Sequence, residues 1–286
     1  MDSLTVATKP HRFSVGEFDL SVFSDGFITL PSGIIAPDAP PDILPGLMER
    51  YSGRTDSADI SVNIPLIRKG EDLILVDTGS GDKFQASAGR LLDNLLAAGV
   101  DPAAVTKVVL THAHPDHAGG IIRPDGSLTF PNAGYYVSAI EWDFWTAKGW
   151  EFRVPSALHE FALGAQRDLG AIIDRVCLVK AGDDIVSGLR VLATPGHTPG
   201  HISLEMEGGD GLLISADAIN NALISFEHPQ WRFGFDTDQD LAVRTRTALI
   251  DRVATDRTRM LGYHWPTPGA GMAERKGGGY RFLAIP

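Results

Sequence analysis

Four side chains of the types that bind metal ions lie within six consecutive positions of this 286-residue chain. The segment directly follows the apolar run 108–110 and reads Thr111-His112-Ala113-His114-Pro115-Asp116-His117. Imidazole and carboxylate groups are the ligands of borderline divalent ions, among which zinc is the commonest in proteins. The chain is therefore constrained to a fold in which the end of one strand presents a metal site.

Pro115 determines the local geometry that we expect for this segment. A proline disfavours the helical conformation in the residue before it, so the chain up to His114 should be extended. Residues two apart in an extended stretch point the same way, and His112 and His114 are therefore predicted to bind one ion together. Asp116 and His117 lie just beyond, where the chain turns, and can bind a neighbouring ion. Two such ions need roughly six or seven protein ligands if one carboxylate bridges them.

Three further residues of ligand type lie at the ends of predicted strands in the second half of the chain. They are His197, Asp217 and His264. Loops at the edge of a rigid sheet commonly carry functional side chains, so we expect these three to complete the metal site. His201 lies four residues after His197 and begins a predicted strand, which favours a supporting or structural role for it.

The chain mixes strand and helix patterns without a regular βαβ alternation. Alternating apolar residues predict strand structure over 13–30, with Asp25-Gly26 as a turn. Residues 31–58 contain several prolines and predict a long ordered loop or arm. We predict α/β layers with two mixed or mostly antiparallel sheets, in a single domain over 1–286 whose N-terminal strand and arm region ends near residue 58.

Composition argues against several classes of protein. The net charge of −11 disfavours binding to a phosphate backbone, so no nucleic-acid partner is expected. The N-terminus lacks the pattern of a signal peptide and no apolar run is long enough to cross a bilayer, which predicts a cytoplasmic protein with no membrane partner. Cys177 is the only cysteine, so no internal disulfide can form. Its apolar neighbours predict a buried and inert thiol.

The order of the seven candidate ligands along the chain resembles the metallo-β-lactamase superfamily. The Asp77-Thr78-Gly79 turn is similar to the first motif of that superfamily, in which the aspartate supports the metal loop. The resemblance covers roughly residues 60–265. It implies an α/β fold of the αββα sandwich type, in which two mixed sheets are flanked by helices and the metals lie at one edge between the sheets.

The same resemblance implies a division of the ligands between two zinc ions. One ion is held by His112, His114 and His197, the other by Asp116, His117 and His264, and both by Asp217. A hydroxide between the metals is expected to attack the substrate, with Asp116 or Asp217 passing a proton to the leaving group. Asp77 and Thr111 are expected to orient the ligands. Iron, manganese and cobalt stay open as metals, because the same ligands suit them.

A closer resemblance is to the methyl parathion hydrolase group within that superfamily. The matching stretches are residues 111–120, 197–201, 264–269 and 279–282. The pocket of that group is walled by aromatic residues, and its helix motif corresponds here to Asp143-Phe144-Trp145. The resemblance thus implies a small-molecule substrate with an ester, lactone or phosphotriester bond, and the candidate pocket residues are Trp145, Phe84 and Phe161.

Other functions share parts of this pattern. Many acyl-homoserine lactonases have a tyrosine where this chain has Asn220, which counts against a lactonase but leaves it open. The antibiotic-hydrolysing β-lactamases usually lack the aspartate corresponding to Asp217, which argues against penicillin-type substrates. A glutathione-thioester hydrolase shares all seven ligands but usually needs a basic patch that binds glutathione. Arg275-Lys276 is a weak candidate for that patch. The acidic charge argues against a nuclease of the same fold. A redox di-iron protein would need a flavin domain, for which no segment remains. A non-catalytic metal module needs only about four ligands, so the presence of all seven argues against it. Residues 31–58 are a candidate segment for packing across a homodimer.

Overall fold

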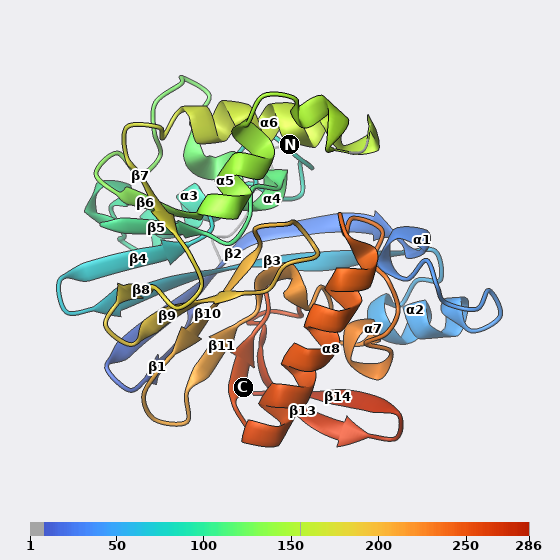
Figure 1. Ribbon diagram of the computed structural model, residues 1–286. Helices are drawn as coiled ribbons and strands as arrows, with labels where there is room; N and C mark the ends of the chain where they lie inside the picture. The colour runs from blue at the N-terminus through green and yellow to red at the C-terminus, as the bar shows by residue number, and fades with distance from the viewer. Residues whose placement is uncertain (1–8, 155, 286) are drawn as a thin grey trace, which may run out of the picture.

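Two mixed sheets of seven strands each form the centre of the molecule, and helices lie on the outer faces of both (Figure 1). The computed structural model describes residues 9–154 and 156–285. One sheet has the strand order β1-β2-β3-β4-β5-β6-β7, and the other has the order β14-β13-β12-β11-β10-β9-β8. The predicted αββα sandwich is confirmed.

The first sheet comes from the N-terminal part of the chain. Its strands β1 to β4 are antiparallel neighbours, whereas β4 to β7 run parallel. They are β1 (His11–Val15), β2 (Phe18–Pro31), β3 (Ser57–Lys69), β4 (Asp72–Val76), β5 (Lys107–Leu110), β6 (Gly134–Ser138) and β7 (Val176–Val179). The main helices on this side are α3 (Leu91–Ala97), α4 (Pro115–Ala118), α5 (Ala139–Thr146) and α6 (His159–Gly170). Short 3-10 turns join them at η1 (Pro102–Ala104), η2 (Gly119–Ile121), η3 (Trp150–Phe152) and η4 (Ser156–Leu158).

The second sheet comes from the C-terminal part, and only its β11 and β12 pair in parallel. Its strands are β8 (Asp184–Val186), β9 (Leu189–Ala193), β10 (Ile202–Met206), β11 (Leu212–Ile214), β12 (Arg259–Leu261), β13 (Ala270–Lys276) and β14 (Gly279–Ala284). The remaining elements of this half are η5 (Ala216–Ala218), α7 (Ile224–Glu227) and α8 (Gln239–Asp256). Helix α8 makes the crossover between the two parallel strands, and the side chain of Asp238 caps it by accepting a hydrogen bond from Leu241 N.

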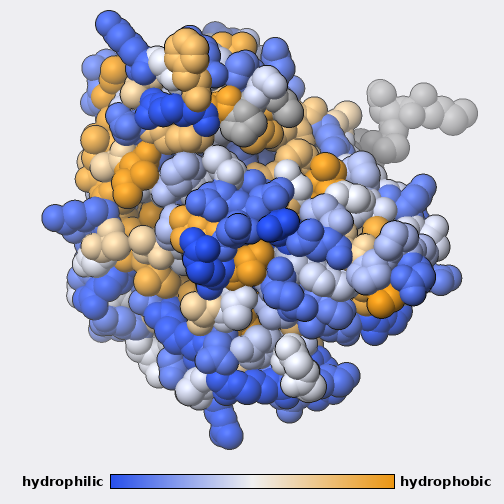
Figure 2. Space-filling view, turned by 45° about the vertical axis from the view of Figure 1, so that its right-hand side comes forward, coloured by the Kyte–Doolittle hydropathy of each residue, from blue (hydrophilic) through white to orange (hydrophobic). Residues whose placement is uncertain are grey.

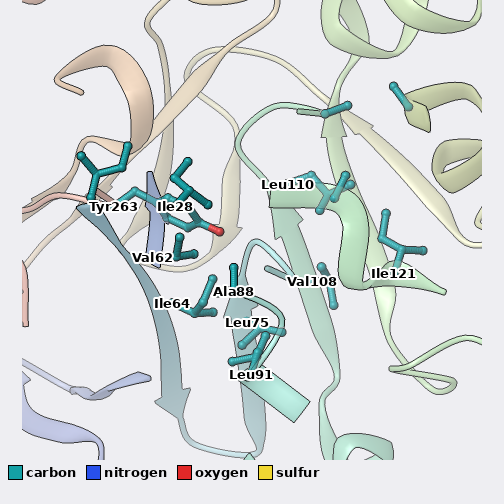
Figure 3. Close-up of a cluster of buried hydrophobic side chains, with 14 of the residues drawn as sticks. Ile28, Val62, Ile64, Leu75, Ala88, Leu91, Val108, Leu110, Ile121 and Tyr263 are labelled. Atoms are coloured by element: carbon teal, nitrogen blue, oxygen red, sulfur yellow. The ribbon is translucent and has the colours of Figure 1, made fainter. Parts of the chain in front are cut away.

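Three apolar layers follow from the alternation of side chains along the strands. On β4, Leu75 faces the helices, whereas Ile74 and Val76 face the second sheet, because successive side chains of a strand point to opposite faces. Figure 3 shows Leu75 in the helix-side cluster together with Val108 of β5. Helix α8 covers the second sheet with a separate cluster that includes Val253. The strand ends that carry the candidate ligands are thus held between rigid layers.

The predicted long loop over 31–58 is wrong, because this segment contains two helices. They are α1 (Ser32–Ile35) and α2 (Leu44–Ser52), and β3 already begins at Ser57. Pro45 lies in the first turn of α2, where a proline costs no hydrogen bond and has a favourable backbone angle. The prolines that we took as loop signals are therefore compatible with helix starts.

The prediction of a buried Cys177 is also wrong. The thiol is exposed, because Cys177 lies on β7, which forms the outer edge of the first sheet. Of the four residues in this strand only Val179 is buried, and Leu178 is 52% exposed. The apolar run marks a strand at the border of the sheet, not one in its interior.

The predicted turn at Asp25-Gly26 is a bulge inside one continuous strand. The register of β2 against β3 shifts between Ser24 and Gly26, and Gly26 has a φ of 109°. A Cβ at Gly26 would lie 2.1 Å from Ser87 O, so only glycine fits here. Asp25 is fully buried and accepts hydrogen bonds from three backbone amides, at 2.8, 3.0 and 2.8 Å, donated by Ser80, Gly89 and Leu91.

The surface of the described residues is polar over wide areas. On the face seen in Figure 2, hydrophilic residues cover most of the lower half and hydrophobic ones gather toward the upper left. No helix in the described ranges combines the length and the apolar character needed to span a membrane. Residues 1–5, on which the expectation about a signal peptide rests, lie outside the described residues, and the single domain over 1–286 stays a prediction.

We predict that Asp25→Asn destabilises the fold by about 3 kcal/mol, because an amide nitrogen would then face buried N–H donors that need an acceptor. The urea midpoint should fall at an unchanged slope. The matched control is Asp19→Asn on the same strand, where the side chain is exposed and the change should stay within about 0.5 kcal/mol. Equal stability of the two variants would contradict a bracing role for Asp25.

Candidate metal centre

All seven candidate ligands meet at one edge of the two sheets. Two come from the connection between β5 and α4, two from α4 itself, one from the loop between β9 and β10, one from η5 after β11, and one from the residues that follow β12. Every one of them is buried, and the most accessible, Asp116, is only 7% exposed. The ends of parallel neighbours such as β11 and β12 lie at the same sheet edge, which explains why residues so distant in sequence converge.

The local fold of the histidine segment follows the expectation from Pro115. His114 is extended, with φ −68° and ψ 157°, and Pro115 begins the short helix α4. Asp116 and His117 lie inside that helix, so the chain turns immediately after His114. This change from extended to helical backbone directs the two pairs of side chains to different parts of the same centre.

Three imidazoles form the first group. His114 Nδ1 lies 3.1 Å from His112 Nε2 and 3.0 Å from His197 Nε2. A zinc ion with bonds of about 2.0–2.1 Å to tetrahedral ligands keeps its ligand nitrogens about 3.3 Å apart. The three nitrogens are therefore already close to the spacing that a single ion requires, and they form one of the possible metal-binding groups of the described residues.

The second group combines imidazoles and carboxylates. His264 Nε2 lies 3.3 Å from Asp116 Oδ2, and His117 Nε2 lies 3.7 Å from the same oxygen. Asp217 lies between the two groups: its Oδ1 is 3.4 Å from His117 Nε2, and its Oδ2 is 3.3 Å from His197 Nε2. One carboxylate thus faces both sets of nitrogens.

Unpaired buried atoms at this centre fit a pair of cations. Among the residues that the structure describes, His117 Nε2 and Asp217 Oδ1 are buried and make no hydrogen bond. Buried polar atoms are nearly always paired, and leaving one unpaired costs about 1–3 kcal/mol. Both atoms point into the centre, and the donor set of nitrogen and oxygen is that of zinc and related ions. The residues present therefore fit a dinuclear metal site.

The electrostatics of the two groups differ. Burial and the neighbouring imidazoles hold the pKa values of His112 and His114 well below the usual 6.5, so both rings are neutral and keep a lone pair for a metal. Burial also lowers the pKa of His264, but the carboxylates of Asp217 and Asp116 outweigh it and raise this pKa to about 10. A cation that binds here replaces a proton, so metal uptake should release protons.

Asp77 and Thr111 lie behind the ligands, in the places expected for orienting residues. Asp77 accepts hydrogen bonds from Thr111 N at 2.7 Å and from Thr111 Oγ1 at 2.8 Å. Its other contact is with His117 Nδ1, at 2.8 Å. The carboxylate thereby ties the strand end to the ring that faces Asp217, and the far nitrogen of that ring is fixed.

His201 supports the backbone of the site. Its Nε2 accepts a hydrogen bond from Asp217 N at 3.1 Å, and its Nδ1 lies 2.8 Å from Thr194 Oγ1. Burial lowers the pKa of His201 to about 3, so the ring is neutral and its Nε2 can accept. This contact holds the turn in η5 from which the Asp217 side chain reaches the centre.

Several residues that support the candidate ligands were not predicted from the sequence. Asp236 lies 2.9 Å from His197 Nδ1 through its Oδ1. Tyr263 stacks on His117 with ring centroids 3.8 Å apart and donates a hydrogen bond to Asp116 O. Tyr263 directly precedes His264 and could have been noticed for that reason, whereas nothing near Asp236 in the sequence indicates its role.

The cavity in front of the ligands has an apolar wall. Phe84 and Phe161, two of the candidate pocket residues, line it with ring centroids 6.0 Å apart. Phe233 and Phe235 complete the aromatic wall and were not predicted. Trp145 does not line this cavity: it is fully buried behind His114, at a centroid distance of 5.9 Å, so its placement in the pocket wall is corrected.

Comparison with known families gives one match over most of the chain. The model described as the metallo-beta-lactamase superfamily matches residues 58–264. A curated relative, the N-acyl homoserine lactonase AttM of Agrobacterium fabrum (strain C58 / ATCC 33970), is 34% identical over 138 residues, which are 44% of this chain and 46% of the relative. The chain therefore spans about half the length of the curated AttM lactonases that it matches.

Solved structures resemble the whole described fold. AidC, a dizinc quorum-quenching lactonase solved in complex with a product, superposes with a TM-score of 0.91 at 30% identity and covers 98% of both chains. The hydrolase AbOPH, described as a member of the beta lactamase superfamily, superposes with a TM-score of 0.89 at 28% identity, over 97% of this chain and 98% of its own.

We predict that the protein takes up close to two zinc ions per chain and that His114→Ala lowers this content to about one. Removing the ions with a chelator should lower Tm by about 5 °C or more, because the buried ligands lose their common partner. Elemental analysis and thermal unfolding measure the two effects. His11→Ala is the control, since His11 lies on β1 outside the centre. Retention of two ions by His114→Ala would show that His114 is not a ligand.

Proposed function

The chain belongs to the metallo-β-lactamase superfamily, and on that premise we propose that it is a dinuclear metal-dependent hydrolase of esters and lactones. The observation that carries the proposal is the position of the Asp217 carboxylate between two groups of imidazoles. One metal would be held by His112, His114 and His197, the other by Asp116, His117 and His264, and Asp217 would contact both. Zinc is the proposed metal, and iron, manganese and cobalt are the alternatives that these ligands accept.

The side chains around the cavity suit the hydrolysis of a carbonyl substrate. When bound, two divalent cations supply a Lewis acid that polarises a carbonyl oxygen and lowers the pKa of water. Asp116 and Asp217 line the cavity, so either carboxylate can accept the proton of the attacking water and deliver it to the leaving oxygen. The phenylalanine wall excludes water and contacts the apolar part of the substrate.

The lining of the cavity favours a neutral substrate. Its wall consists of phenylalanine, leucine and isoleucine side chains together with metal-ligand candidates, and none of the lining residues within 9–154 and 156–285 is a lysine or an arginine. Glutathione carries carboxylates that need cationic partners. Arg275, the candidate for that role, lies on β13 and is ion-paired with Asp251 at 2.6 Å. These contacts favour an ester or lactone over a glutathione thioester.

Asn220, which stands where many acyl-homoserine lactonases have a tyrosine, has a structural role here. Its Nδ2 donates to Asp217 O at 2.9 Å, and its Oδ1 accepts from Arg246 at 3.2 Å. Asn220 is buried and does not belong to the residues that line the cavity, so it neither supports nor opposes a lactone substrate. The likeness to AidC, described as a lactonase, supports the lactone proposal.

A substrate panel tests the proposed function. We expect the zinc-loaded protein to hydrolyse an N-acyl homoserine lactone or an aryl ester, with kcat/KM at least about tenfold above that for a glutathione thioester, because the cavity offers no partner for carboxylates. A phosphotriester belongs in the same panel, since the cavity also suits a neutral phosphorus ester. Turnover of the thioester alone would contradict the proposal. The cytoplasmic location and the homodimer stay predictions.

A pocket variant tests the role of the aromatic wall. Phe84→Ala should raise KM for an apolar acyl lactone roughly tenfold and leave kcat within about threefold, because it removes about 1–3 kcal/mol of apolar contact away from the reacting atoms. Phe152→Ala is the matched control, since this phenylalanine is 94% exposed. An unchanged KM in steady-state kinetics would place the substrate elsewhere.

A further inference from the structure

The imidazoles of the metal centre are not all held in the same way. Four of them have a hydrogen-bond partner on the ring nitrogen that faces away from the centre: His112 with Thr111, His117 with Asp77, His197 with Asp236 and His264 with Ser61. His114 differs, because its Nε2 is buried and has no hydrogen-bond partner among the residues that the structure describes. Such partners normally fix the orientation of a metal-bound ring, so His114 must be oriented by other means.

Packing and the backbone replace the missing hydrogen bond. The ring of His114 packs edge-on against Trp145 and Phe161, at centroid distances of 5.9 and 5.6 Å. The backbone before it is held by Ala113 N, which donates to Glu141 Oε1 at 3.0 Å. The position of His114 therefore depends on the ring of Trp145 and on the carboxylate of Glu141.

Glu141 connects both of these supports to the loop that carries His197. Its Oε1 also accepts a hydrogen bond from Trp145 Nε1 at 2.6 Å. Its Oε2 accepts from Thr198 Oγ1 at 2.6 Å and from Gly200 N at 3.1 Å. The side chain is fully buried, so these four hydrogen-bond donors take the place that water molecules would have around an exposed carboxylate. A single carboxylate thus joins the segments on both sides of the first group of imidazoles.

The contact between α5 and the His197 loop is close as well as polar. A Cβ at Gly200 would lie 2.0 Å from Glu141 N, so only a glycine at this position lets the loop after His197 approach α5 this closely. Burial raises the pKa of Glu141 above its usual value, and the four hydrogen-bond donors offset this rise only in part. None of the hydrogen bonds of Glu141 reaches the second group, which is held instead through Asp77 and Ser61.

We propose that Glu141 is a positioning residue that sets the spacing of His112, His114 and His197, and that it governs metal affinity at this group and not at the other. The inference rests on the proposed dinuclear site. Replacing the carboxylate by an amide of the same shape turns one acceptor oxygen into a donor that faces N–H and O–H groups. The segment that carries His112 and His114 should then move away from the loop that carries His197. The three ring nitrogens would no longer be spaced to bind one ion.

Zinc affinity measured one group at a time tests this proposal. His264→Ala removes a ligand of the second group, and His112→Ala removes one of the first, so each background reports on the group that is left intact. In the His264→Ala background, Glu141→Gln should weaken Zn²⁺ binding about tenfold or more in a competition titration with a chromophoric chelator. In the His112→Ala background the change should stay below about threefold. Asp143→Asn, on the same helix with an exposed side chain, is the control and should alter neither group.

Two further variants keep the test decisive. Trp145→Phe keeps an aromatic ring but removes one donor, and should weaken the first group less than Glu141→Gln does. If Glu141→Gln does not fold, as judged by circular dichroism, Thr198→Val removes a single donor and should weaken the first group alone by about threefold. Equal losses at both groups, or none at either, would overturn the role of Glu141. Failure of the His264→Ala protein to bind any zinc would overturn the proposed metal site, and this inference with it.

Discussion

The crowding of buried polar groups around Asp217 is the constraint on which the rest of the structure depends. Within each of its three groups of imidazoles and carboxylates, the ligand atoms lie within 4.8 Å of one another, and all seven side chains are buried. Such a cluster loses its hydration on folding, and several of its atoms find no hydrogen bond in return. Two bound cations would offset this loss of hydration. Before metal binding, the residues around the cluster have to hold its side chains in place.

That scaffold is distributed over the whole molecule. Asp77 follows β4 of the first sheet, Asp236 precedes α8, and Glu141 comes from α5 on the outside of the first sheet. The backbone oxygen of Ser61 adds a contact from β3. These partners come from several elements of the fold, so the positions of the ligands depend on more than one region of the chain.

The sequence indicates the ligands more readily than it does their supports. Seven residues of ligand type at strand ends are conspicuous, and the superfamily resemblance that they carry leads to the observed pair of sheets. Glu141 and Asp236 become visible only in three dimensions, because their partners are distant backbone amides and ring nitrogens that no local pattern records. Trp145 was predicted to be a pocket residue because it matches the helix motif of the methyl parathion hydrolase group, and such a match does not say which side of the helix the ring faces. The edge position of Cys177 depends likewise on the order of strands in the sheet, which apolar runs do not encode.

Phe161 packs near His114 and also near the rings of Phe84 and Phe235, at centroid distances of 5.6, 6.0 and 5.9 Å. One ring therefore belongs both to the wall that a substrate would meet and to the packing that orients a metal ligand. As related enzymes evolve, a mutation at Phe161 that changes the shape of the wall would also disturb the orientation of His114 and so weaken metal binding. A mutation at Phe84 would change the wall with a smaller effect on metal binding. New substrate preferences should accordingly arise first through mutations at rings such as Phe84, which do not pack against His114.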